Sequence, residues 1–158
     1  MILRSIALVA VGVAVAGASY VRLAPMEAEV WHVDPGAAER TGRPNDFLIA
    51  PGGDMDPVQS PLSPEALTTL LTEDLEAQPR TTQLAATPDE GIYTYVQRTR
   101  MMGYPDVINL RVQPTPEGSS LTLWSRSRYG QSDLGVNRAR VEALLQRTGL
   151  TAGPIGDQ

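Results

Sequence analysis

The longest apolar run of the chain lies near its amino terminus, where Arg4 and Arg22 enclose an uncharged stretch, residues 5–21. A helix of this length spans about 25 Å, which is at the short end for crossing a bilayer. We therefore expect residues 1–23 to form a membrane anchor that stays attached to the chain. The alternative is a secretory signal peptide, because the small residues 16–18 fit the pattern that precedes a cleavage site.

Charges on either side of this run predict its orientation. Arg4 and the amino terminus are positive, whereas Glu27, Glu29 and Asp34 soon follow Arg22. Because positive charge is retained on the cytoplasmic side of a membrane, both interpretations place the rest of the chain outside the cytoplasm. We expect a single-pass protein of the bacterial inner membrane with its C-terminal domain in the periplasm, or a periplasmic protein if the leader is cleaved.

Two later segments have the three-to-four-residue spacing of amphipathic helices. The first follows Ser63, a favoured helix cap, and ends before Pro79. The second begins near Asn137 and stops at Gly149, because glycine commonly ends helices. The apolar stripes are Leu67, Leu70, Leu71 and Leu75 in the first helix and Val141, Leu144, Leu145 and Thr148 in the second.

Four segments between these helices have the alternation or the composition of strands, at 80–87, 92–102, 106–113 and 121–129. The short turns between them predict an antiparallel meander. We therefore expect an α+β fold, in which a meander sheet of about four strands is covered by two helices and preceded by one N-terminal transmembrane helix.

Beyond the leader, the chain is long enough for one small domain. Proline, glycine and charge dominate the segment that follows the anchor, and residues 45–50 are a further short strand candidate. The expected organisation is an anchor or signal peptide at 1–23, a linker or lead-in at 24–44, an α+β globular domain at 45–150 and a tail at 151–158.

Composition excludes several chemistries. The chain has no cysteine, and its 13 basic residues are all arginine. Thiol nucleophiles, thiolate metal sites, disulfides and Schiff-base lysines are therefore excluded. With His32 as the only histidine and with Asp54 and Asp56 as an incomplete calcium loop, we expect no metal and no cofactor.

Charge is distributed unevenly along the chain. Residues 1–90 hold 5 arginines and 13 acidic residues, whereas residues 91–158 hold 8 arginines and 5 acidic residues. The second half is therefore suited to an anionic partner. The overall pI near 4.8 argues against nucleic acid as that partner.

Three arginines are expected on one face of the predicted sheet. Arg126 and Arg128 alternate on one strand, and Arg111 joins them from the neighbouring strand. Guanidinium groups on one face repel each other unless an anion or carboxylates lie among them. The functional hypothesis is therefore an anion-recognising surface.

A structural hypothesis accounts for the same residues. Asp133 would pair with a strand arginine, Gly130 and Gly135 would allow a tight bend between strand and helix, and Asn137 would cap the helix. The sequence leaves both hypotheses open.

One strand presents a conflict of parity. Arg98 and Arg100 alternate in phase with Ile92 and Val96, which we expect to point into the core. A β-bulge between them would resolve the conflict.

Residues 125–145, with the sequence SRSRYGQSDLGVNRARVEALL, resemble the signature of the bacterial and plastid family called domain of unknown function 1499. Residues 31–35, WHVDP, and 20–25, YVRLAP, are similar to the lead-in of proteobacterial members. The resemblance covers most of residues 30–148 and implies no established activity. It implies that the family's signature here consists of Ser125, Arg126, Ser127, Arg128, Gly130, Ser132, Asp133, Gly135, Asn137 and Arg140.

These observations lead us to expect a membrane-anchored extracytoplasmic protein that acts by binding, without catalysis, as an accessory to another inner-membrane protein. The expected contact residues are Arg111, Arg126, Arg128, Asp133, Asn137 and Arg140. One alternative is a small module that uses the same arginines to bind an anion or a lipid headgroup. Another is a carboxylate-based hydrolase, which would need two acids such as Asp106 and Asp133 to converge.

Overall fold

The computed structural model describes residues 2–151. All but the first residue of the tail expected at residues 151–158 therefore lies outside the described residues. Within the described range, one six-stranded antiparallel sheet has the order β1-β6-β5-β4-β3, and β2 also pairs with β6. The strands are β1 (Asp46–Ile49), β2 (Val58–Ser60), β3 (Thr81–Thr87), β4 (Ile92–Arg98), β5 (Pro105–Thr115) and β6 (Gly118–Ser127).

The last four strands form the predicted meander, and the α+β class is confirmed. The sheet has six strands instead of about four because β1 and β2 pair with successive parts of β6, on the edge that β5 leaves free. β2 has three residues between prolines, so it is too short to give a periodic pattern in the sequence.

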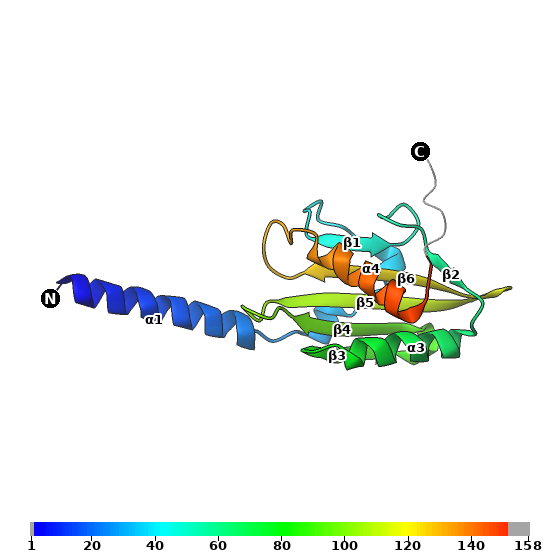
Figure 1. The fold of residues 1–158 in the computed structure, drawn as a ribbon, viewed down its shortest axis with the longest axis horizontal. Coiled ribbons are helices and arrows are strands. Elements are labelled where there is room, and N and C mark those ends of the chain that lie inside the picture. The colour runs from blue at the N-terminus through cyan, green and yellow to red at the C-terminus, as the bar shows by residue number, and fades with distance from the viewer. Residues whose placement is uncertain (1, 152–158) are drawn as a thin grey trace.

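Both predicted helices cover one face of the sheet, as Figure 1 shows. α3 (Pro64–Ala77) begins after Ser63, whose hydroxyl accepts a hydrogen bond from the amide of Ala66 at 3.3 Å. α4 (Val136–Thr148) ends at Gly149, which has a left-handed φ of 68°. The other helical elements are α1 (Ile2–Leu23), α2 (Ala28–Trp31) and the 3-10 turns η1 (Pro35–Ala37) and η2 (Pro88–Glu90).

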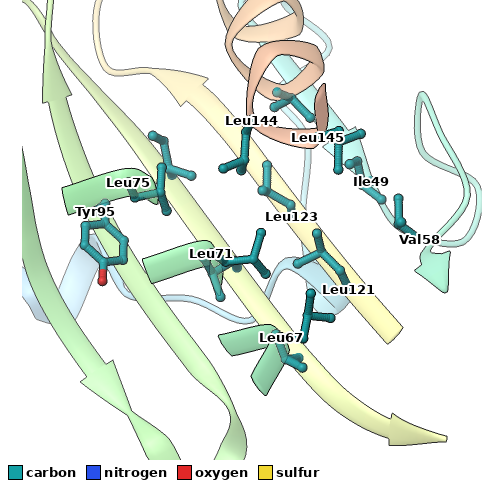
Figure 2. Packing of buried hydrophobic residues seen from close by; sticks show 14 of the residues in the cluster. Ile49, Val58, Leu67, Leu71, Leu75, Tyr95, Leu121, Leu123, Leu144 and Leu145 are labelled. Carbon is teal, nitrogen blue, oxygen red and sulfur yellow. The ribbon is translucent and has the colours of Figure 1, made fainter. Parts of the chain in front are cut away.

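The main core lies between this pair of helices and the sheet. Leu71 and Leu75 of α3 and Leu144 of α4 meet Leu123 of β6, and each of them is at most 1% exposed (Figure 2). Burial of one such leucine stabilises the fold by about 1.5–3 kcal/mol. Tyr95 of β4 is also buried here; burial, and then the hydrogen bond that its hydroxyl donates to Glu76, raise the pKa of its phenol.

The opposite face of the sheet is covered by the segment that follows α1. Val33 and Ala38 pack against a small cluster of Leu48, Ala50 and Trp124. The first part of the segment that we expected as a linker therefore lies on the sheet and shields its second face from water.

This second cover resolves the conflict of parity on β4. Ile92 and Val96 are buried beneath the lead-in, whereas Tyr95 lies in the main core, so β4 is buried on both faces. The register between β4 and β5 runs without interruption from Ile92 to Arg98. Arg98 therefore shares the lead-in face with Ile92 and Val96, and its side chain donates to the carbonyl of Gly103 at 3.1 Å.

α1 extends away from the folded body (Figure 1). Its segment Arg4–Leu23 has a mean hydropathy of 1.9 and is not buried by any other part of the described chain. Among the described residues it is the one helix that is long and apolar enough to cross a membrane, and a signal sequence would have the same character. Arg22, in its last turn, donates to the carbonyl of Met101 at 2.7 Å and to that of Met102 at 3.2 Å.

Candidate functional site

The loop between β6 and α4, residues 128–135, is held by the carboxylate of Asp133. We call it the signature loop. Oδ1 of Asp133 accepts from the amide of Gly135 at 3.0 Å, and Oδ2 accepts from the amide of Asn137 at 2.7 Å. The first amides of a helix lack partners within the helix, and a nearby carboxylate satisfies them and interacts favourably with the helix dipole. Asp133 therefore provides the cap of α4.

This geometry corrects two expectations. Asn137 does not cap α4, because it is the second residue of the helix and its side chain is fully buried. Asp133 does not pair with a strand arginine in the described part of the chain, because both of its oxygens are directed to the start of α4. Gly130 and Gly135 have φ of 95° and 81°, which supports the expected tight bend.

The Asn137 side chain connects the helix to the sheet. Its Oδ1 accepts from Ser125 Oγ at 2.7 Å, and its Nδ2 donates to the carbonyl of Asn45 at 3.0 Å and to Ser127 Oγ at 3.1 Å. Ser125 and Asn137 are both completely buried. Polar atoms without contact to water must be hydrogen-bonded to avoid a large desolvation cost, and this asparagine meets that demand.

Arg140 extends the same buried network from the next turn of α4. Its Nη2 donates to Asp106 Oδ2 at 2.6 Å, its Nε to Gln97 Oε1 at 2.6 Å, and its Nη1 to Asn137 Oδ1 at 2.6 Å. The side chains of Arg140 and Asp106 are 12% and 3% exposed. One guanidinium thus joins α4 to β4 and β5 through a buried ion pair.

A hollow of about 400 Å³ lies against this network, between the signature loop and the β4–β5 loop. Tyr104 and Tyr129 form one side, with ring centroids 6.2 Å apart. The other lining residues are Val21, Thr99, Asp106, Ser127, Gly130, Ser132, Asp133, Leu134 and Val136. Its wall combines apolar and polar groups, and Val21 contributes to it from the last turns of α1.

The three sheet arginines lie on the opposite, lead-in face and have partners from the lead-in. Arg111 forms an ion pair with Asp34, and Arg128 donates to the carbonyl of Pro25 at 2.6 Å. The guanidinium carbon of Arg126 lies 3.7 Å from the ring centroid of Trp124 and 5.1 Å from that of Trp31.

Arg126 is a partly buried cation between two indole rings. Burial lowers its pKa to about 10, although Asp46 nearby partly opposes that change. The side chain remains charged at neutral pH, and the electron-rich faces of the indoles stabilise the charge.

The six expected contact residues are therefore divided between two faces of the sheet. Arg111, Arg126 and Arg128 lie beneath the lead-in, whereas the other three belong to the network and the cap on the helix side: Asp133, Asn137 and Arg140. The structure does not bring the two groups together into one surface.

The residues of this network lie within the region that matches a known protein family. The family model described as "Protein of unknown function (DUF1499)" matches residues 33–147. The chain belongs to this family. The DUF1499 match includes the whole sheet, α3, nearly all of α4 and the signature loop, and it confirms the resemblance seen in the sequence. No curated protein and no solved structure matches the chain.

The two carboxylates of the hydrolase hypothesis both line the hollow of the DUF1499 domain. Asp106 is bonded to Arg140, and Asp133 is bonded to amides of α4. Each carboxylate thus has a structural role in the arrangement seen here, and the geometry supplies no acid–base pair aimed at a shared point.

Two weaker candidates also have structural partners. His32 lies between two threonine hydroxyls, with Nδ1 2.7 Å from Thr94 Oγ1 and Nε2 2.9 Å from Thr87 Oγ1. Asp54 accepts from the amide of Leu48 at 2.9 Å and forms an ion pair with Arg40. Within the described residues there is no group of three or more histidine, aspartate or glutamate side chains that could hold a metal ion.

Sequence reasoning missed Tyr104, Tyr129 and Gln97 as parts of the site. The tyrosines come from two different loops, and Gln97 reaches Arg140 from β4. Nothing in the local pattern identifies them, because only the meander and the placement of α4 bring these segments together. The family signature was the one signal that pointed to this end of the domain.

Proposed function

We propose that this chain is a membrane-anchored protein whose DUF1499 domain stands outside the cytoplasm and acts by binding. The observation that carries the proposal is α1: a segment of 20 residues with a mean hydropathy of 1.9, left unburied by the described chain. At 1.5 Å per residue this segment is about 30 Å long, which matches the hydrocarbon thickness of a bilayer.

The distribution of charge around α1 supports the orientation. Arg4 is the first residue of the segment, and Glu27, Glu29 and Asp34 follow the segment. Arg22 lies in its last turn and donates to two carbonyls of the β4–β5 loop. The amino terminus and Arg4 together give the short amino-terminal end the larger positive charge, which favours a cytoplasmic amino terminus.

The contact site in this proposal is the hollow beside the signature loop. The sheet arginines already have protein partners, whereas the hollow is open to solvent and adjoins the end of α1. Its mixed wall, with Tyr104 and Leu134 beside Ser132 and Asp133, favours a second candidate, the binding of an amphiphile such as a lipid headgroup with its first methylenes.

Membrane extraction tests the anchor. In a bacterial host the chain should remain in the membrane pellet after washing at alkaline pH, with an intact mass that includes residue 1. A variant with Val9→Arg and Val13→Arg is the matched control, because charges in mid-span are costly, and it should be lost from the pellet. Recovery of the unaltered chain as a soluble protein, at full mass or cleaved near residue 18, would contradict the proposal.

Photocrosslinking tests the contact site. A photoreactive amino acid at Tyr104 lies in the wall of the hollow, and one at Glu117 lies in the turn at the opposite end of the meander. The proposal expects adducts specific to position 104. Protein adducts favour an accessory role and lipid adducts favour the amphiphile site, whereas equal adducts at both positions would contradict the assignment of the hollow.

A further inference from the structure

We propose that the tips of the β4–β5 loop (residues 99–104) and of the signature loop are seated in the interfacial region of the periplasmic leaflet, beside the end of α1. This inference rests on the proposed membrane anchor. It adds a second contact with the lipid, made by the folded domain itself.

The first observation is a concentration of exposed apolar side chains. Among the described residues that follow Leu23, the large apolar side chains classed as exposed are Val30, Leu62, Met101, Met102, Tyr104, Leu134 and Val136. Four of these seven lie in the two loops. A fifth, Val136, follows the signature loop directly and is the first residue of α4. Single exposed apolar residues are ordinary on a protein surface, but a cluster marks a contact surface.

The second observation is the position of this cluster relative to α1. Arg22 donates to the carbonyls of Met101 and Met102, and Val21 lines the same hollow as Leu134. Figure 1 shows both loops at the end of the domain from which α1 extends. An arginine at the end of a membrane span lies at the level of the lipid headgroups, so a loop bonded to it lies at that level too.

The third observation is the backbone of Leu134. Its φ is 54° and its side chain is 94% exposed. The left-handed region is normally occupied by glycine, asparagine or aspartate, and water favours a polar residue at such a tip. Strain that is retained at an exposed position points to a use for the side chain, and a lipid environment would favour leucine there.

The groups around these tips are those that suit a headgroup layer. Arg22, Arg100 and Arg128 supply positive charge near the tips, and Tyr104 supplies an aromatic ring with a polar end. The acid of the signature loop, Asp133, is turned inward to the amides of α4. Basic and aromatic residues around an apolar tip favour an anionic bilayer surface as the occupant over an acidic or apolar protein.

Depth measurement in a bilayer tests the inference. The chain has no cysteine, so single-cysteine variants can be labelled with an environment-sensitive fluorophore at one position only. Full-length protein is placed in nanodiscs of phosphatidylethanolamine and phosphatidylglycerol that contain lipids spin-labelled at the headgroup or along the acyl chain. The probes are Leu134→Cys and Met101→Cys, with Leu62→Cys as the matched exposed control, because its backbone lies beside the β5–β6 turn. Val9→Cys marks the span.

The inference expects a blue shift and several-fold stronger quenching at positions 134 and 101 than at position 62, strongest with the headgroup-labelled lipid. If position 9 is quenched while positions 134, 101 and 62 behave alike, the inference is wrong and the anchor stands. If position 9 is not quenched either, the proposed membrane anchor fails, and this inference fails with it.

Discussion

The guanidinium of Arg140 and the carboxylate of Asp106 form an ion pair that water scarcely reaches, with side chains 12% and 3% exposed. Such a pair adds little net stability compared with apolar residues of similar size, because both charges lose their hydration. Removal of one partner is different, since it leaves the other charge buried alone. Arg140 also donates hydrogen bonds to the side-chain oxygens of Gln97 and Asn137.

We therefore predict that Arg140→Met destabilises the fold by about 3–5 kcal/mol. The matched control is Arg138→Met on the same helix, whose ion pair with Glu142 is largely exposed and whose loss should cost less than about 1 kcal/mol. Urea unfolding of full-length protein in detergent measures both variants. Equal effects of the two substitutions would show that the buried network does not hold α4.

A second variant separates burial of charge from loss of packing. Asp106→Asn added to Arg140→Met removes the uncompensated carboxylate, so it should recover part of the lost stability. If the double variant is as unstable as the sum of the two single variants, Asp106 is not the partner that makes Arg140 costly to remove.

The strain at Leu134 gives a prediction of the opposite sign. Leu134→Asn places in the left-handed region a residue that tolerates it, so the thermal unfolding temperature should stay constant or rise, with a gain of up to about 1 kcal/mol. Leu62→Asn, at an exposed leucine without a positive φ, should give no such gain. A marked loss of stability in Leu134→Asn alone would contradict the assignment of strain.

At this scale the sequence pointed to residues whose contacts it did not specify. Asp133, Asn137 and Arg140 all lie in the site, yet the cap is formed by Asp133 and not by Asn137. The choice depends on which side chain reaches the free amides of α4, and that is decided by the path of a loop with three left-handed residues. Local spacing does not specify such a path.

Among the elements, the lead-in has the largest consequence for the function of the sheet. Its short helix α2 places Trp31 against Arg126, and the carbonyl of Trp31 accepts from Asn109 Nδ2 at 2.8 Å. The lead-in thereby partly covers a sheet face that carries three arginines. The sequence suggested an open face there because proline, glycine and charge in residues 24–44 gave no sign of packing.

Trp31→Ala tests this role of the lead-in. Loss of the indole uncovers the Arg126 guanidinium and should destabilise the domain by about 1–3 kcal/mol. Val30→Ala, in the same turn and exposed, is the matched control and should have little effect. Hydrogen exchange should increase in β5 and β6 of the tryptophan variant only; an unchanged pattern would show that the lead-in rests on the sheet without stabilising it.

The predictable elements were those whose pattern is local. The stripes of α3 and α4 and the alternation of β5 were sufficient for their assignment, and Ser63 caps the start of α3 while Gly149 ends α4, as expected. The strand candidate at residues 45–50 is confirmed as β1, whereas β2 was missed, because it exists through pairing with β6 over three residues. The hydrogen bonds of β2 are long-range in sequence, so no local window contains the reason for it.

At the scale of the whole molecule, three features lie at one end of the domain: the last turn of α1, the hollow, and the exposed apolar tips of two loops. The opposite end carries the β5–β6 turn with Glu117 and the exposed Leu62. Under the proposed function, the end that carries the hollow faces the membrane and the opposite end faces the periplasm.

The most direct measurement is the accessibility of a cysteine at position 117 to a membrane-impermeant maleimide in bacteria whose outer membrane has been permeabilised. The natural chain contributes no cysteine background, and the same Glu117→Cys variant after complete lysis gives the full signal. The account predicts full labelling of position 117 before lysis, while the inner membrane is still intact, in a protein that sediments with the membrane. Protection of position 117 until the inner membrane is broken would contradict it.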